Sequence, residues 1–463
     1  MNFKGKKVLI AGIARSGISA AILLKKLGAF ITISDSKTED KIIDEAAKLK
    51  AYDISLYLGK NPDDIAAEQD LIVLSPGVPS DLPFILKAEK NNVSVWSEIE
   101  LGYRLCPCPV IAITGTNGKT TTTSLVGEIF KNYAENTAVV GNIGIPFTEK
   151  VLSLDEKSFA VAEKSSYQLE KIVEFKPKVS AVLNITPDHL NRHKTLQNYI
   201  QVKTRIFENQ NENDYLILNY DDSVCRNMKD KAKCRVLYFA ETDSLDKTGL
   251  LEGVYSDMKS IFVKFGNYNQ KVIDVSELKI LGRHNVQNAM AAIGISLAAE
   301  IPMDIIINTL KNFKAVEHRI EYVTTINDIE FYNDSKGTNP DAAINAINAM
   351  KRPICLIGGG YDKKSDFDEW IKAFEGKVKY FAIIGEVSGK IINTCEKYGF
   401  RNYERADSLE DAVKMCFENA EEGDCVLLSP ACASWDMFES YEQRGRLFKE
   451  FSINIKARNS YAL

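Results

Sequence analysis

The stretch VIAITGTNGKT, residues 110–120, decides how this chain folds. An apolar run enters a glycine turn and helix-compatible residues follow, which predicts a strand, a tight turn and a helix start. Backbone N–H groups of such a turn, backed by the helix N-terminus, can converge on a phosphate. Lys119 is placed to neutralise the β- and γ-phosphates, and the Thr120 hydroxyl to ligate Mg²⁺. We therefore predict a nucleoside triphosphate site. The spacing from Gly115 to Gly118 is shorter than in the usual G-x-x-x-x-G-K-[ST] loop, so an ordinary turn with a surface lysine is the alternative.

Length and composition limit the class of protein. A chain of 463 residues is typical of roughly three domains. A net charge of −5 argues against a protein that wraps nucleic acid. No apolar run reaches the length of a membrane span, and the N-terminus lacks the pattern of a signal peptide. The nine cysteines lack metal-like spacing, with Cys106-Pro107-Cys108 too close for a C-x-x-C site, which favours reduced thiols. We expect a cytoplasmic monomer that acts on small molecules, without nucleic acid or membrane insertion.

Short apolar runs alternate with helical stretches along most of the chain, which predicts an α/β protein with mostly parallel sheets. We place three domains at 1–100 (Rossmann-like), 101–316 (central, P-loop) and 317–463 (Rossmann-like). Residues 236–280 look different and predict an antiparallel annex, followed by a helix over 285–299. The expected strands are 7–13, 31–35, 71–75, 93–96, 110–115, 138–141, 159–163, 179–185, 215–219, 236–240, 260–263, 271–275, 329–333, 354–358, 381–385 and 425–429.

The first block contains a degenerate nucleotide fingerprint. GIARSG, residues 12–17, has Ala14 where a dinucleotide-binding turn has glycine, and Asp35 closes the next strand where a Rossmann domain places its ribose-binding acid. SPGVP, residues 75–79, ends another strand at the same edge. A turn with a purely structural role is an equally good explanation. The replacement of a glycine by Ala14 favours a diphosphate ligand other than NAD.

A lysine lies in the middle of a predicted apolar helix face. At 100° per residue, the stretch 195–209 gathers its apolar residues on one stripe, and Lys203 falls within it. Burying an unpaired ammonium is costly, so this lysine needs a reason. A stem that snorkels to solvent is the alternative.

Two further strand ends point to the same edge of the central sheet. Glu163 closes the strand at 159–163, and His189 follows the strand at 179–185. A carboxylate is a preferred Mg²⁺ ligand, whereas an imidazole is an unusual one. Together with the phosphate loop, these positions predict a metal–phosphate site, although each residue alone could be structural.

Four motifs resemble one family, the ATP-dependent Mur ligases of bacterial cell-wall precursor synthesis: GTNGKTT at 115–121, EKSSYQL at 163–169, NITPDHLNRH at 184–193 and GRHNVQN at 282–288. The resemblance implies that Lys203 reacts with CO₂ to form a carbamate. It implies two Mg²⁺ ions, held by Thr120, Glu163, His189 and Lys203. It implies ATP contacts from Gly115, Thr116, Asn117, Gly118, Lys119, Thr120, Thr121, Asn288, Arg319 and Asp334.

The third block resembles the D-glutamate-adding branch of that family. NDSKGTN at 333–339 and SPACASWDMF at 429–438 are present, while the D-N-P-x-R motif of the diamino-acid branch is not. The resemblance implies that Thr338 and Lys363 contact the glutamate α-carboxylate, and Ser434 and the Tyr441 backbone its side-chain carboxylate. It assigns the uridine diphosphate to Asp35, Ser36, Ser75, Pro76 and Gly77, and the muramoyl-alanine portion to Asn142, Ser165 and His189.

The implied reaction is ATP-dependent amide formation between UDP-N-acetylmuramoyl-L-alanine and D-glutamate through an acyl phosphate. Lys119, His189, Lys203 and Lys336 are the candidate catalytic residues, and Asp188, His189 and Lys336 are unranked candidates for the base. Lys164 departs from the family's apolar residue, but strand alternation points it away from Glu163, so we expect it to affect packing. One alternative is another enzyme of the same fold, either a different Mur ligase or a folylpolyglutamate synthetase. A second is a regulatory P-loop protein without ligase chemistry, and a third is that residues 1–98 form the NAD-binding domain of a dehydrogenase.

Overall fold

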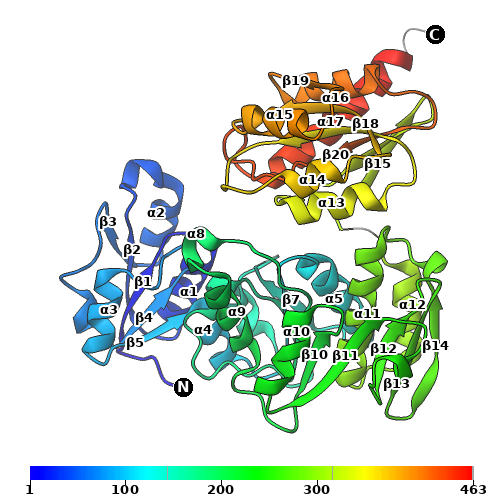
Figure 1. The fold of residues 1–463 in the computed structure, drawn as a ribbon. Helices are drawn as coiled ribbons and strands as arrows, with labels where there is room; N and C mark the ends of the chain where they lie inside the picture. The colour runs from blue at the N-terminus through cyan, green and yellow to red at the C-terminus, as the bar shows by residue number, and fades with distance from the viewer. Residues whose placement is uncertain (143, 315, 461–463) are drawn as a thin grey trace. The chain divides into compact units, whose positions relative to one another are not determined.

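A computed structural model describes residues 1–142, 144–314 and 316–460, and these form three sheets flanked by helices (Figure 1). The expected α/β class with three sheet-containing domains is confirmed. By compactness the chain divides into two units: Met1–Val275 with Gln287–Lys311, and Ser276–Val286 with the residues from Asn312 onward. The first unit contains the first two sheets, and the second unit contains the third. Our domain boundaries at 100 and 316 stay a prediction.

The first sheet is parallel throughout, in the order β3-β2-β1-β4-β5. Val8 and Ile10 of β1 point into the core on one face, and Leu9 and Ala11 into the core on the other. Because both faces are covered, the strand reads as one apolar run. The strands are β1 (Lys7–Ala11), β2 (Phe30–Asp35), β3 (Ser55–Leu58), β4 (Leu71–Leu74) and β5 (Ser94–Ser97), and the helices are α1 (Arg15–Lys26), η1 (Glu39–Lys41), α2 (Ile43–Lys50), η2 (Ala66–Glu68), α3 (Pro83–Lys90) and α4 (Glu98–Leu105).

The central sheet has the order β14-β13-β12-β11-β10-β9-β6-β8-β7. Our expectation of an antiparallel annex from residue 236 was partly wrong. Strand β11 pairs parallel with both β10 and β12, and antiparallel pairing begins only between β12 and β13. Polar and apolar residues alternate in the last strands, and we extended that pattern to β11. This strand is instead largely buried. The strands are β6 (Val110–Thr114), β7 (Thr137–Gly141), β8 (Phe159–Glu163), β9 (Val179–Val182), β10 (Tyr215–Asn219), β11 (Arg235–Glu241), β12 (Gly253–Ser256), β13 (Ser260–Phe265) and β14 (Tyr268–Asp274).

Helices flank this sheet, and several of them begin just after the turns that follow its strands. The expected helix over 195–209 is α9 followed by a 3₁₀ turn, and the one over 285–299 is α11. The helical segments are α5 (Lys119–Tyr133), α6 (Phe147–Lys150), η3 (Val151–Ser153), α7 (Ser166–Leu169), α8 (Leu190–His193), α9 (Leu196–Thr204), η4 (Arg205–Phe207), α10 (Ser223–Asn227), η5 (Met228–Lys231), η6 (Leu245–Lys247), η7 (Val275–Glu277), α11 (Arg283–Ala298) and α12 (Met303–Asn312).

The third sheet has the order β15-β16-β20-β17-β18-β19. Among the described strand pairs of this sheet, only β15–β16 is antiparallel. Leu356 of β17 packs into one core, while Cys355 and Ile357 pack into the opposite one. The strands are β15 (Glu321–Ile326), β16 (Ile329–Asn333), β17 (Ile354–Gly359), β18 (Val378–Ile384), β19 (Tyr403–Arg405) and β20 (Cys425–Leu428), and the helices are α13 (Pro340–Ala349), α14 (Asp368–Lys372), α15 (Ser388–Lys397), α16 (Leu409–Glu418) and α17 (Tyr441–Ser460).

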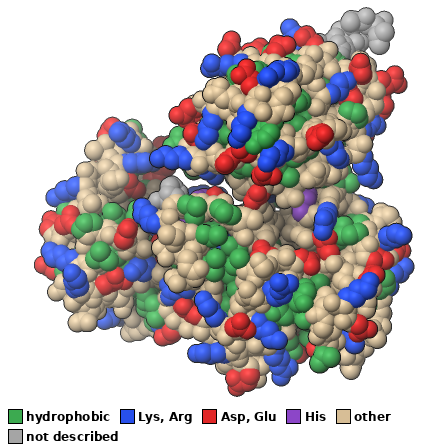
Figure 2. Space-filling model, viewed as in Figure 1, with side chains coloured by type: hydrophobic (Ala, Val, Ile, Leu, Met, Phe, Trp, Pro, Cys, Tyr) green, Lys and Arg blue, Asp and Glu red, His purple; other side chains and the backbone are tan. Residues whose placement is uncertain are grey.

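The surface carries charges of both signs. Figure 2 shows Lys and Arg side chains interspersed with Asp and Glu side chains over the viewed face. In the part of the chain that the structure describes, no helix combines the length and the apolar character needed to cross a membrane.

Helix α4 is anchored to the central domain by a buried carboxylate. The Glu100 side chain is fully buried, and it accepts the backbone N–H groups of Val173, Glu174 and Phe175, each at 2.9 Å. Arg104 Nε also donates to Glu100 Oε1 at 2.6 Å. Buried backbone donors need such partners, so one side chain fixes the strandless segment after α7.

We expect Glu100→Ala to lower the free energy of unfolding by about 3 kcal/mol, because it leaves the buried N–H of Phe175 and the partly buried N–H groups of Val173 and Glu174 without their acceptor and removes one of the two carboxylates that pair with Arg104. Urea unfolding followed by circular dichroism measures the change. Glu128→Ala, which removes an exposed glutamate of α5, is the matched control and should change stability by less than about 0.5 kcal/mol. Equal effects of the two substitutions would show that the anchor is unimportant.

Candidate active site

The turn after β6 has the backbone shape of a phosphate-binding loop. Gly115 and Gly118 have φ angles of 155° and 81°, which residues with a side chain rarely adopt. A Cβ atom on Gly118 would lie 2.3 Å from Oδ1 of Asn288, so only glycine fits against α11. Gly118 is the N-cap of α5, and the first N–H groups of that helix are therefore available to an anion.

Asn184, which follows β9, fixes the conformation of this loop. Its Oδ1 accepts the N–H of Asn117 at 2.8 Å, and its Nδ2 donates to the carbonyl oxygen of Asn117 at 3.0 Å. Its own carbonyl oxygen accepts the N–H of Thr116 at 2.9 Å. These bonds hold the loop in one arrangement, so a phosphate that binds there has little backbone to order.

Lys119 lies across the same turn. Its Nζ donates to the carbonyl oxygens of Gly115 at 2.9 Å and Thr116 at 2.7 Å. Asn288 of α11 accepts a hydrogen bond from Thr122 Oγ1 at 3.2 Å, which joins α11 to the first turn of α5. Thr120 and Thr121 are buried in that turn. The structure thus brings together the predicted ATP residues 115–121 and Asn288. Arg319 and Asp334 belong to the second unit and are described with it.

Glu163 ends β8 beside the loop with a half-satisfied carboxylate. Its Oε1 accepts a hydrogen bond from Asn142 Nδ2 at 2.7 Å. Its Oε2 is buried and has no hydrogen-bond partner among the described residues. A buried carboxylate oxygen is unfavourable without a donor or a cation. This oxygen is therefore suited to a hard cation such as Mg²⁺.

Lys203 of α9 is buried beneath the same loop, with a relative exposure of 1%. Its Nζ donates to the carbonyl oxygen of Gly115 at 2.7 Å and to Thr114 Oγ1 at 3.2 Å. The alternative of a stem that snorkels to solvent is excluded by these contacts. Burial, helped by the positive charge of Lys119, holds the pKa of Lys203 well below its usual value. The amine can therefore exist in the neutral form that acts as a nucleophile.

His189 is held in a strained turn at the start of α8, with φ of 55°. The carboxylate of Asp188 accepts the backbone N–H of His189 at 2.8 Å, and its other oxygen lies 3.5 Å from Nε2 of the ring. The ring packs against Tyr167, with centroids 5.1 Å apart. Ser165 is the N-cap of α7 in a capping box with Gln168, so its backbone is fixed beside Glu163.

Lys164 is fully buried on the other side of β8 from this site. Its Nζ lies 5.3 Å from the ring centroid of Phe147 and 5.6 Å from that of Phe175, with no hydrogen-bond partner in the described ranges. Burial lowers the pKa of Lys164 to about 8, opposed by the negative charges of Glu98 and Glu163. These aromatic contacts agree with the expectation that this lysine affects packing.

Arg192 joins the central domain to the first sheet, a role that the sequence analysis missed. It donates to the carbonyl oxygens of Pro76 at 3.2 Å and Val78 at 3.0 Å, and it pairs with Glu170 at 2.6 Å. The predicted substrate turn 75–79 is therefore held against the motif that carries His189. Its place in the NITPDHLNRH motif was the only available sequence signal.

The turn after β1 is closed by contacts within the first sheet. Asp35 accepts the N–H of Ile13 at 2.8 Å, and Ser75 Oγ donates to the carbonyl oxygen of Gly12 at 2.9 Å. A Cβ atom on Gly17 would lie 2.0 Å from that carbonyl oxygen, so glycine is required for packing. Asp35 and Ser75 thus meet at one edge, whereas Ser36, next to Asp35, is exposed.

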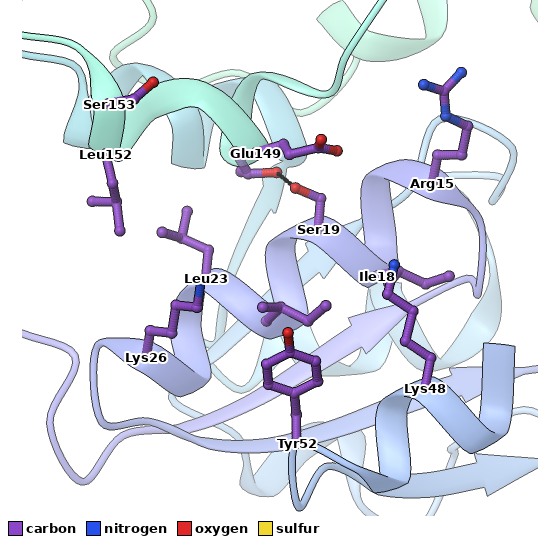
Figure 3. Close-up of a pocket in the computed structure, with 12 residues that line it drawn as sticks. Arg15, Ile18, Ser19, Leu23, Lys26, Lys48, Tyr52, Glu149, Leu152 and Ser153 are labelled. Carbon is purple, nitrogen blue, oxygen red and sulfur yellow. Dashed lines mark hydrogen bonds between the residues drawn. The ribbon is translucent and has the colours of Figure 1, made fainter.

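A cavity of about 570 Å³ lies beside α1 (Figure 3). At its side Thr148 Oγ1 donates to Ser19 Oγ at 2.9 Å, the bond drawn as a dashed line in Figure 3. Its lining combines apolar side chains with the cationic side chains of Arg15, Lys26 and Lys48, and it includes none of the predicted site residues. The lining includes Arg15, Ile18, Leu23, Lys26, Lys48, Tyr52 and Leu152.

In the second unit, Asp334 is buried at the end of β16. It accepts a hydrogen bond from Ser429 Oγ at 2.8 Å. Burial raises the pKa of Asp334 to about 6, opposed by the positive charge of Arg319. The predicted ATP residues Arg319 and Asp334 are therefore close enough to interact electrostatically.

A buried guanidinium organises the predicted amino-acid site of this unit. Arg444 donates to the carbonyl oxygens of Ser335 at 2.8 Å and Cys432 at 3.2 Å, and to Ser335 Oγ at 3.0 Å. Ser335 Oγ in turn donates to the carbonyl oxygen of Tyr441 at 2.8 Å. Burial lowers the pKa of Arg444 to about 10, which still leaves it charged at neutral pH. One side chain thus joins the turns after β16 and β20, and sequence reasoning did not single it out.

These turns carry the predicted carboxylate-binding residues. Lys363 Nζ lies 3.5 Å from the carbonyl oxygen of Thr338, and Lys336 Nζ lies 5.2 Å from the ring centroid of Tyr441. Ser434 is buried two residues after Cys432, whose carbonyl Arg444 binds. The side chains of a small cationic and hydroxylic cluster are thus grouped at the carboxyl edge of the third sheet, which suits a small dianion.

Glu317, His318 and Glu321 have ligand-type atoms within 4.8 Å of one another. Lys449 Nζ already lies between the two carboxylates, at 2.6 Å from Glu317 and 2.9 Å from Glu321. The lysine supplies the cation that this cluster needs, and we do not assign a metal to it.

Comparison with known proteins gives matches along the chain. Three family models match: "Mur ligase MurD-like, N-terminal domain" over residues 6–97, "Mur ligase middle domain" over 113–296 and "Mur ligase, glutamate ligase domain" over 318–432. A relative from Thermoanaerobacter pseudethanolicus, named UDP-N-acetylmuramoylalanine–D-glutamate ligase, is 50% identical over 98% of this chain and 100% of its own length. A relative of the same name from Lachnoclostridium phytofermentans is 47% identical over the same shares.

A solved structure shares the fold at low identity. UDP-N-acetylmuramate-alanine ligase from Thermotoga maritima is 19% identical with a TM-score of 0.60, covering 96% of this chain and 98% of its own. The three family models, the relatives that match almost end to end and the shared fold agree. This chain belongs to the Mur ligase family.

Proposed function

We propose that this chain joins D-glutamate to UDP-N-acetylmuramoyl-L-alanine, with ATP converted to ADP and phosphate, in cytoplasmic peptidoglycan precursor synthesis. The observation that carries the proposal is the 50% identity, over 98% of the chain, to a relative named for this ligation. The match includes the third sheet, which carries the candidate amino-acid site. The phosphate loop and its buried lysine supply the ATP chemistry.

The reaction must make a poor electrophile reactive. The carboxylate of the alanyl group attacks the γ-phosphorus of ATP, ADP leaves, and an acyl phosphate forms. The amine of D-glutamate then attacks the carbonyl carbon, the C–N bond forms, and phosphate leaves as the C–O bond breaks. The attacking amine has to lose a proton, for which Asp188, His189 and Lys336 are candidates.

The phosphate loop would bind and orient the triphosphate. The N–H groups at the start of α5 would contact the phosphate oxygens, and Lys119, held over the turn, would neutralise charge that grows on the β- and γ-phosphates. Asn184 keeps that loop in position. Thr120, in the first helical turn, would contribute its hydroxyl to the cation.

Lys203 would become an anion by reaction with carbon dioxide. Its neutral amine attacks the carbon of CO₂, an N–C bond forms, and one proton is lost to give a carbamate. The carbamate, the unpartnered Oε2 of Glu163 and His189 would then offer ligands to Mg²⁺. The family uses ATP and Mg²⁺, and the bound ion supplies charge neutralisation to the phosphates.

The two acceptor substrates would be held by different turns. Asp35, Ser36 and the turn 75–77 would hold the uridine diphosphate, and Asn142, Ser165 and His189 the muramoyl-alanine portion. In the second unit, Thr338 and Lys363 would bind one carboxylate of D-glutamate, and Ser434 with the Tyr441 backbone the other. Arg444 would keep those turns in register.

We expect phosphate release with UDP-N-acetylmuramoyl-L-alanine to require D-glutamate out of a panel that includes L-alanine, glycine and diamino acids. Lys363→Ala should raise KM for D-glutamate at least about tenfold, because one charged contact to a carboxylate is lost. Lys351→Ala, which changes an exposed lysine of the same unit, is the control. Turnover with another amino acid but not D-glutamate would overturn the substrate assignment.

We expect Lys119→Ala to lower kcat/KM for ATP at least about a hundredfold, since a preorganised cation at the phosphates is removed. Coupled phosphate-release kinetics measure it. Lys131→Ala, at the exposed end of the same helix, should leave turnover unchanged. Equal activity of the two variants would contradict the role of Lys119 at the phosphates.

We expect Lys203→Ala to lose most activity and to regain part of it with added acetate or formate, because a small carboxylate can replace the carbamate anion. Wild-type protein in ¹³C-labelled bicarbonate should show a carbamate carbon signal that Lys203→Ala lacks. Lys233→Ala, at an exposed lysine, is the control for general effects of lysine loss. Full activity in Lys203→Ala would exclude a carbamate role.

A further inference from the structure

Cys106 and Cys108 bring two thiols into contact between α4 and β6. The backbone at Cys106 is extended, with φ of −78° and ψ of 122°, as expected for a residue that precedes proline. In extended backbone, alternate side chains point to the same side. The two Sγ atoms lie 3.4 Å apart.

The pair is accessible from a surface hollow. A cavity of about 490 Å³ is lined by both cysteines together with Tyr103, Arg104 and Lys176. The Cys106 side chain is partly exposed, and Cys108 has a relative exposure of 8%. A small molecule can therefore reach Cys106 first, with Cys108 directly behind it.

The two thiols have opposite tendencies to ionise. The hydrogen bond between the two sulfur atoms lowers the pKa of Cys106 and, together with burial, raises the pKa of Cys108. Cys234, the other partly exposed cysteine, has a pKa raised to about 11 by burial. Thiolates are the reactive form of cysteine, so Cys106 is the favoured nucleophile.

We propose that Cys106 and Cys108 form a redox-active dithiol that closes to an internal disulfide by exchange with small-molecule disulfides. The Cys106 thiolate attacks one sulfur of the small disulfide, which forms a mixed disulfide and releases one small thiolate. Cys108 then loses its proton and attacks Cys106 Sγ, which forms the Cys106–Cys108 bond and releases the second thiolate. The protein dithiol is oxidised by two electrons, and the small disulfide is reduced to two thiols.

The inference stands apart from the proposed ligase reaction, because neither cysteine lies among the candidate substrate residues. Its location nevertheless ties it to the fold. Only Pro109 separates Cys108 from Val110, the first residue of β6, which leads into the phosphate loop.

The test incubates the reduced full-length protein with oxidised glutathione and follows intact mass and peptide maps under non-reducing conditions. We expect the loss of two hydrogens and a peptide that joins Cys106 to Cys108, reversed by dithiothreitol. No change in mass, a persistent glutathione adduct at Cys106, or a bridge between other cysteines would overturn the proposal.

Three variants separate the steps. Cys108→Ser should stop the reaction at a stable glutathione adduct on Cys106, and Cys106→Ser should abolish formation of the bridge. Cys234→Ser, the matched partly exposed control, should react as wild type does. Phosphate release by each reduced variant reports folding, so a failure of the dithiol is distinguishable from a failure of the ligase assignment.

Discussion

The site depends on two lysine side chains that converge on one backbone oxygen. Lys119 and Lys203 both donate to the carbonyl oxygen of Gly115, at 2.9 and 2.7 Å. Two ammonium groups in such proximity repel, and Lys203 is the one that is removed from water. Losing the positive charge is therefore less costly for Lys203 than for Lys119. The positive-φ glycines shape this turn, and a side chain on Gly118 would collide with Asn288 of α11.

Charge is handled differently at the third sheet. Arg444 is completely buried, and its described hydrogen bonds go to neutral carbonyl and hydroxyl oxygens. A guanidinium has donors in several directions, so it can hold several carbonyl groups that would otherwise be unsatisfied. The buried charge of Arg444 thus orders the backbone of this unit, whereas Lys363 lies at the carboxyl edge of the sheet, where we propose that a dianion binds.

Strand periodicity and strand-end chemistry predicted much of the fold. Buried strands such as β1, β6 and β17 are apolar on both faces, and the sequence identifies them for that reason. The strands β3, β15 and β19 were missed because most of their residues are at least partly exposed, so none of them shows the continuous buried apolar run of an inner strand.

The candidate site was predictable where a residue's type conflicts with its position. Lys203 on an apolar stripe and Glu163 at a buried strand end carried such a signal. Arg192, Asn184 and Arg444 did not, because each acts through contacts with segments far away in the chain. The resemblance to a family supplied the substrate residues, and their roles stay predictions.

The anchoring of α4 has a consequence for motion. Glu100 binds three consecutive amides of the central domain, Ser97 donates its N–H to the carbonyl oxygen of Lys171, and Arg192 holds the turn after β4. These bonds connect the helix after the first sheet, and the turn after β4, to segments of the central domain. We therefore expect an acceptor molecule that reaches from the turn after β4 to the turn after β6 to be selected by its length.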